Sequence, residues 1–313
     1  MKQLFIIIII SIFTSDICAQ KTIDYYKGIN EGKIFAIQND FKSAINSYQQ
    51  VFIKNDFVFA RDCFNAIQLS ILAKDSVKIE YFIERAISQG IRISDIEKSY
   101  NLTDYMKSNV YNDIKEKEDS LLNVYSSRIN WKIRKEINQM FLEDQKTREE
   151  YYNGNIFQKN KIRKKWKKLN TIQVERLIEI TKQYGFPGEK LIGFDRSEMH
   201  SKIFTNNYSA GMPIVIFIHH FSQPNLSYDS LLIDEVKKGN LYNEHFGTIC
   251  DFEAEFGKSR FENYGYYGLR HQPRRLNENE LNLKRQKIGI LEFEQIEKLN
   301  KIKNISKFWN LLY

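Results

Sequence analysis

The sequence predicts a mostly α-helical protein, in which N-terminal helical hairpins pack on a predominantly helical C-terminal domain. Its 313 residues include only 4 Pro and 14 Gly, which is too few for a turn-rich β protein. Apolar residues also recur every three or four positions along most of the chain, the spacing of one helix face. We expect three parts: a signal peptide at 1–19, a helical repeat-like domain with long connecting helices at 20–139, and a helical domain with closing helices at 140–313.

The N-terminus has the pattern of a cleavable secretory signal. One positive charge precedes an apolar run over residues 4–13, which is shorter than the roughly 20 residues that span a bilayer. Cleavage after Ala19 would leave a mature chain without a membrane span, periplasmic or secreted. A lipid anchor on Cys18 is the alternative, and the large side chain of Ile17 in front of it argues against lipidation.

The net charge and the cysteine content limit which partners and which disulfides we expect. The net charge of +8 belongs to the mature chain, and export makes nucleic acid an unexpected partner. We interpret the basic run at 159–168 as a solvated helix face or loop, with an anionic surface as the alternative. Cys63 and Cys250 are too few for a disulfide scaffold, and the sequence leaves open whether they pair.

Residues 24–92 read as paired helices. Gly32 and Ala44 stand twelve positions apart among aromatic residues, and a step of 34 positions from Gly32 reaches Ala66. This pattern resembles a tetratricopeptide repeat, in which small residues let two helices pack closely. The second copy is degenerate, because Lys78 stands where a small residue is expected. Such units need about three copies or a cap, so we expect them to dock on the rest of the chain.

The remaining elements follow from periodicity and from helix-breaking residues. A run at 212–221 fits either a buried strand or a helix beginning at Pro213. The other expected helices are one or two over 94–148, one over 171–184, one each over 228–238 and 243–255, and one or two closing helices over 278–313.

No common chemical motif is present in the sequence. It contains no His-Glu-x-x-His metal spacing, no phosphate loop and no nucleophile elbow. The neighbours His219 and His220 point in different directions on either a helix or a strand, so they do not form a metal pair. We therefore expect neither a metal nor a cofactor.

Several short motifs of polar residues and glycines follow one another over residues 140–268. They resemble an uncharacterised bacterial domain family with a D-Q-x-x-R, G-x-P, Q-H-A, D-R and Q-x-Y-G-T-Q signature, and the resemblance implies a helical domain. This chain departs from it at Phe252 and over Glu262–Tyr267, which puts any inherited activity in doubt. The matching residues are Asp144-Gln145, Arg148, Gly185-Phe186-Pro187, Gly193, His220, Gly239, Asp251 and Tyr264-Gly265.

The polar residues of that pattern form the candidate catalytic site. In this hypothesis His220 transfers protons, Asp251 orients it and Arg148 holds an anionic group, with Asp144 in the same pocket. Each residue also has an ordinary structural interpretation. Asp144 and Arg148 are four positions apart and can form a surface pair, while His220 can be a core histidine or can face a helix dipole.

The sequence therefore supports two functions. The first is an exported protein- or peptide-interaction module built on the repeat-like helices, which present a concave face. The second is an enzyme, or a degenerate one, acting on a small molecule in the C-terminal domain.

Overall fold

The computed structural model describes residues 24–99, 102–195, 208–220, 228–256, 267–269 and 277–302. Within these ranges the regular structure is helical and contains no strand, which confirms the predicted fold class. The expected signal at 1–19, including Cys18, lies outside them.

The N-terminal part is a stack of short helical hairpins. Helical residues 24–37 precede α2 (Phe41–Lys54), and α3 (Ala60–Ala73) and α4 (Ser76–Ile87) follow. The turns are short, and Asp side chains cap two of the helices. Asp40 accepts the N–H of Ser43 at the start of α2, and Asp75 accepts that of Lys78 at the start of α4.

Small residues set the packing of the first hairpin. A Cβ at Gly32 would lie 2.6 Å from the ring of Tyr48 and 3.1 Å from the carbonyl oxygen of Ala44. A Cβ at Gly28 would lie 2.3 Å from Val51. The two helices therefore approach as closely as the predicted repeat pattern requires. The packed hairpins are compatible with tetratricopeptide-like repeats.

The region expected to hold one or two long helices is divided further. It contains α5 (Ile93–Ser99), η1 (Tyr105–Lys107), α6 (Asn109–Arg128) and α7 (Trp131–Asn153). Asn130 separates the last two, because its side chain accepts the N–H of Ile133 and caps α7. The domain boundary expected at 139 falls inside α7.

The basic run is part of a long helix, α8 (Ile156–Tyr184). The side chains of Asn155 and Gln158 form a capping box that starts α8, and Gly185, with φ of 88°, follows its last residue. The sequence predicted a helix over 171–184 only. Seven cations near the start of α8 interrupt the apolar spacing from which its buried face could be recognised. The short helix α9 (Glu189–Ile192) follows.

The ambiguous run at 212–221 is helical as far as the structure describes it. It forms α10 (Met212–His219), with Pro213 in its first turn and η2 (Ser209–Gly211) before it. Residues 212–218 are all buried, so the run has no polar face from which a period could be read. The helices predicted after it are α11 (Asp229–Lys237), α12 (Asn243–Phe256), α13 (Glu278–Lys287) and α14 (Phe293–Asn300).

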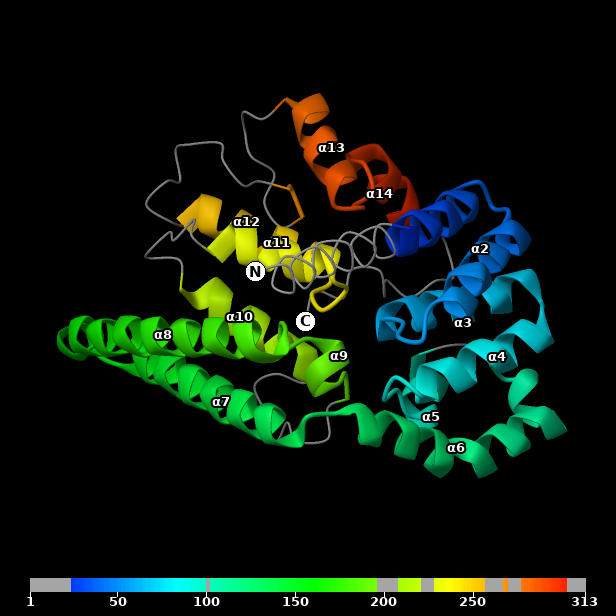
Figure 1. Ribbon diagram of the computed structural model, residues 1–313, viewed down its shortest axis with the longest axis horizontal. Coiled ribbons are helices and arrows are strands. Elements are labelled where there is room, and N and C mark those ends of the chain that lie inside the picture. Colours follow the sequence, from blue (N-terminus) through cyan, green and yellow to red (C-terminus); the bar gives the residue numbers. More distant parts are fainter. Residues whose placement is uncertain are drawn as a thin grey trace, which may run out of the picture.

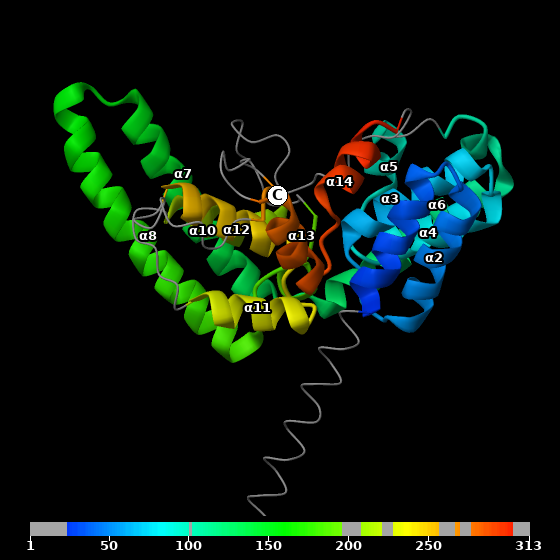
Figure 2. The ribbon, with the colours of Figure 1, turned by 90° about the horizontal axis from the view of Figure 1, so that it is seen from above.

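Figure 1 shows the hairpin of α7 and α8 on one side and α2 to α6 on the other, with α9 between them and with α11 and α12 above α8. Figure 2, turned by 90°, places α13 and α14 between the two sides. One apolar cluster runs through both sides, from Tyr25 to Ile290. Cys63 and Cys250 are free, buried thiols, and burial raises the pKa of each.

In the described ranges, none of the helices combines the length and the apolar character that crossing a bilayer requires.

Candidate functional site

Asp144 is the centre of a buried polar seam between α7 and α8. Its side chain is fully buried, and its Oδ1 accepts hydrogen bonds from Trp166 Nε1 at 2.7 Å and from Asn170 Nδ2 at 2.8 Å. Its Oδ2 accepts one from Gln145 Nε2 at 2.9 Å. Three N–H donors thus hold the carboxylate in one orientation.

The histidine that meets this carboxylate is His219, at the end of α10. Its Nδ1 lies 2.6 Å from Oδ2 of Asp144, and its ring packs edge-on against Trp166 with centroids 5.5 Å apart. The His219 side chain keeps 14% of its surface exposed. A carboxylate at Nδ1 fixes the orientation of the ring and favours the tautomer that is protonated at Nδ1.

His220, the histidine named in the sequence hypothesis, follows directly in the turn after α10. Its backbone N–H donates to the carbonyl of Phe217 at 3.0 Å. Burial lowers the pKa of its imidazole, with Lys167 acting in the same direction and Glu175 opposing. His220 therefore titrates below the usual range of a histidine.

Asp251 and Arg148 have described contacts away from Asp144. The fully buried Asp251 carboxylate accepts the backbone N–H groups of Tyr267, Gly268 and Leu269, at 2.5, 3.1 and 2.5 Å. The Arg148 guanidinium lies 5.4 Å from the ring centre of Tyr152, near the turn between α7 and α8.

The catalytic grouping of the four residues stays a prediction. Residues 257–266, which carry most of the last part of the motif, lie outside the described residues.

Sequence reasoning missed His219, Trp166 and Asn170. A signal for the last two existed, because Trp166, Asn170 and Gln173 follow one another at intervals of four and three on one face of α8. Gln173 continues the seam by donating to the carbonyl of Met140 at 2.7 Å.

A second buried cluster of charges joins the N-terminal hairpins to α9 and α12. Arg61 on α3 lies 2.6 Å from Nε2 of His245 and 3.4 Å from Glu244, with its guanidinium 3.9 Å above the Tyr242 ring. Tyr25 donates to the neighbouring Asp62 at 2.7 Å. Burial raises the pKa of Asp62, against the opposing charges of nearby cations.

Glu189, at the start of α9, belongs to the same buried cluster of charges. Its Oε2 accepts the backbone N–H of Ala60 at 2.7 Å, which ties α9 to the start of α3. Burial raises the pKa of its carboxyl from 4.5 to about 7, although Arg61 acts to lower it. Every ionisable group of this cluster contacts another part of the fold, so the cluster acts as a structural joint.

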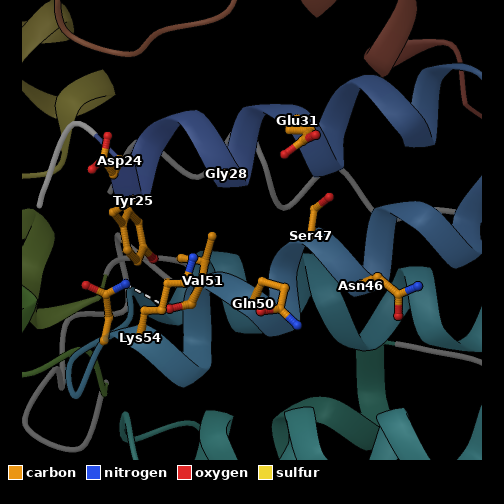
Figure 3. A pocket seen from close by; sticks show the side chains of 10 residues that line it. Asp24, Tyr25, Gly28, Glu31, Asn46, Ser47, Gln50, Val51 and Lys54 are labelled. Atoms are coloured by element: carbon orange, nitrogen blue, oxygen red, sulfur yellow. Dashed lines mark hydrogen bonds between the residues drawn. The ribbon is translucent and has the colours of Figure 1, made fainter.

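The third feature is a pocket of about 530 Å³ between residues 24–37 and α2. Figure 3 shows the two helices side by side, with Asp24 and Glu31 on one and Ser47, Gln50 and Lys54 on the other. Its buried lining is Tyr25 and Val51, beside Gly28, and Asn46 and Asn55 complete it.

Gly28 lets Val51 pack closely in this floor, because a Cβ there would lie 2.3 Å from Val51. Asn46 is held by Lys78 Nζ, which donates to its Oδ1 at 2.8 Å. Lys78, at the position where the repeat pattern has a small residue, therefore reaches across to α2 and supports the pocket wall.

Among the described residues, no group of three or more His, Cys, Asp or Glu is arranged to hold a metal ion. Comparison with family models, with curated proteins and with solved structures gave no match.

Proposed function

We propose that this chain is a protein- or peptide-interaction module, and that the pocket between residues 24–37 and α2 is its binding groove. The observation that carries this proposal is the composition of the groove: an apolar floor of Tyr25 and Val51 under walls of amide, hydroxyl and charged side chains. A peptide presents the matching groups, namely apolar side chains and a backbone that both donates and accepts hydrogen bonds.

The polar walls suit an extended peptide. The amides of Gln50 and Asn46 each have both donor and acceptor groups, as a peptide backbone has. Asp24 and Glu31 on one wall and Lys54 on the other offer both signs of charge to a partner. The close helix contact at Gly32 and the 34-position offset to the buried Ala66 support a tetratricopeptide-like origin for this hairpin.

A blocking substitution tests the groove. Ser47→Trp places an indole in the pocket from a half-buried position, and Ser120→Trp places the same group on the exposed face of α6 as a control. Peptides selected from a displayed random library on the parent chain should bind the Ser47→Trp chain at least about tenfold more weakly by fluorescence anisotropy. They should bind the Ser120→Trp chain unchanged.

Two outcomes contradict the proposal. Either no peptide is enriched on the parent chain, or the enriched peptides bind Ser47→Trp as tightly as the parent. His219→Ala should leave peptide affinity unchanged, because His219 lies on α10 and is not part of the groove.

A second candidate function is an enzyme, or a degenerate one, acting on a small molecule. The contact between Asp144 and His219 favours it, since a partly exposed imidazole held by a buried carboxylate is suited to general acid–base work. Fragment screening by NMR would test it through the ring signals of His219 and the indole N–H of Trp166. A ligand of this site shifts both signals, and His219→Ala abolishes its binding. Fragments that shift neither signal argue against the enzyme.

A further inference from the structure

The turn between α7 and α8 presents an apolar tip to solvent. Phe157 is 89% exposed, Ile156 is 77% exposed and Tyr152 is 59% exposed. In Figure 1 this turn lies at the far end of the hairpin from α2 to α6, and in Figure 2 it extends beyond α10 and α12. Large apolar side chains gathered at the end of a projecting hairpin are typical of an interaction site.

A basic stripe begins at this tip. The first thirteen residues of α8, 156–168, hold seven Lys or Arg and no Asp or Glu. Lys161, Lys164 and Lys168 follow Phe157 by four, seven and eleven positions, which places all four on one face of the helix. The three lysines are exposed, and the stripe extends about 16 Å from Phe157 at the helical rise of 1.5 Å per residue.

The inward face of the same helix has the opposite character. Trp166 and Asn170 point into the seam with Asp144, whereas Lys161, Lys164 and Lys168 occupy exposed positions of the helix. One ion pair of this region joins Lys165 to Glu150 on α7 at 3.1 Å. Arg148, over the ring of Tyr152, adds a further cation near the tip.

We propose that the α7–α8 tip docks on an anionic phospholipid bilayer. Ile156 and Phe157 enter the boundary between headgroups and acyl chains, Tyr152 lies at headgroup level, and the lysine stripe meets lipid phosphates. A bilayer supplies both an apolar layer and negative charge next to each other. A nucleic acid supplies the charge, but gives exposed Ile156 and Phe157 no apolar layer to enter.

The test is flotation of the full chain with vesicles of phosphatidylcholine alone and with added phosphatidylglycerol. Every variant keeps the same N-terminus as the parent, so any binding by the apolar run at 4–13 is common to all. The parent should float with the anionic vesicles, and rising salt should release it.

Two sets of substitutions separate the two contributions. Replacing Lys161, Lys164 and Lys168 with Gln should weaken binding to anionic vesicles about a hundredfold, at roughly fivefold per cation. Phe157→Ser should weaken it about tenfold through loss of one buried aromatic side chain. Matched controls are Lys27, Lys42 and Lys107 to Gln, and Ile53→Ser, which change exposed residues elsewhere and should leave binding unchanged.

Three results overturn the proposal. One is a parent chain that does not float with anionic vesicles. Another is binding that survives both Phe157→Ser and the triple Lys→Gln change. The third is binding of heparin or duplex DNA that depends on the lysines but not on Phe157, together with no vesicle binding, which would assign the stripe to a polyanion.

Discussion

The two hairpins at opposite sides of the molecule hold their helices together in different ways. In the first, residues 24–37 meet α2 across Gly28 and Gly32, whose missing side chains let Val51 and Tyr48 fill the gap. In the second, α7 meets α8 around Asp144, where buried hydrogen bonds add to the apolar packing of the two helices. A glycine contact is stabilised by packing, whereas a buried carboxylate needs every donor in place. The second hairpin should therefore be far more sensitive to a single polar deletion.

Removing the Asp144 carboxylate should have the largest effect. Asp144→Ala leaves the donors of Trp166, Asn170 and Gln145 buried without an acceptor, and we expect it to lower the free energy of unfolding by about 4 kcal/mol. Glu143→Ala is the control, an exposed neighbour that should cost less than about 0.5 kcal/mol. Urea unfolding measures both.

A small cost for Asp144→Ala would change the interpretation of this seam. A buried polar group that contributes little stability is better explained by a role in function, and the enzyme hypothesis would then gain support over the structural one.

The stability that the buried charge cluster around Arg61 and Glu189 gives to the fold should depend on pH. Glu189 titrates near 7 when folded and near 4.5 when unfolded, so the folded chain binds this proton more tightly. Its contribution to stability is fully present below pH 4.5 and is lost as pH rises to 7, by about 3 kcal/mol. Glu189→Gln removes this loss, so its advantage over the parent should grow across that window in urea unfolding at several pH values. Parallel profiles for the two chains would disprove this assignment.

The close contact between residues 24–37 and α2 at Gly32 should not tolerate a larger side chain. Gly32→Ala gains helix propensity but forces a methyl group against Tyr48 and the Ala44 carbonyl, and we expect a net loss of about 2 kcal/mol. Lys27→Ala, on the exposed side of the same helix, should change stability by less than about 0.5 kcal/mol. Thermal unfolding measures the stability of both variants. A stabilised Gly32→Ala chain would show that the two helices can move apart without a loss of stability.

The smallest effect belongs to the surface of the second hairpin. Arg176 pairs with Glu136 at 2.6 Å and with Glu179 at 2.8 Å, but its side chain is 42% exposed. Solvent screens such pairs, so Arg176→Ala should cost about 0.5 kcal/mol. A loss several times larger in denaturant unfolding would show that polar contacts along the hairpin act cooperatively with Asp144.

The same difference between the two hairpins decides which features could be predicted from the sequence. Gly32 and Ala44 carried a readable signal because close helix contact demands small residues at fixed spacing. The course of α8 was predicted only in part, since Trp166 and Asn170 are embedded among cations that suggest a solvated segment.

The choice between His219 and His220 could not be made in advance. The two are adjacent, and which one meets Asp144 depends on where α10 ends against α7 and α8, a tertiary property. Asp251 shows the same limit: its three backbone partners come from 267–269, and local sequence gives no indication of that pairing.

The buried joint has a consequence for how the chain is made. Several polar groups of the first helices find partners only near the other end: Arg61 with His245, Tyr26 with the carbonyl of Leu241, and Asn30 with that of Gly289, separated by 184, 215 and 259 positions. During synthesis from the N-terminus, these groups stay hydrated until the last quarter of the chain emerges. Contacts this distant slow folding. The hairpins that are translated first are therefore among the last parts to reach their final packing.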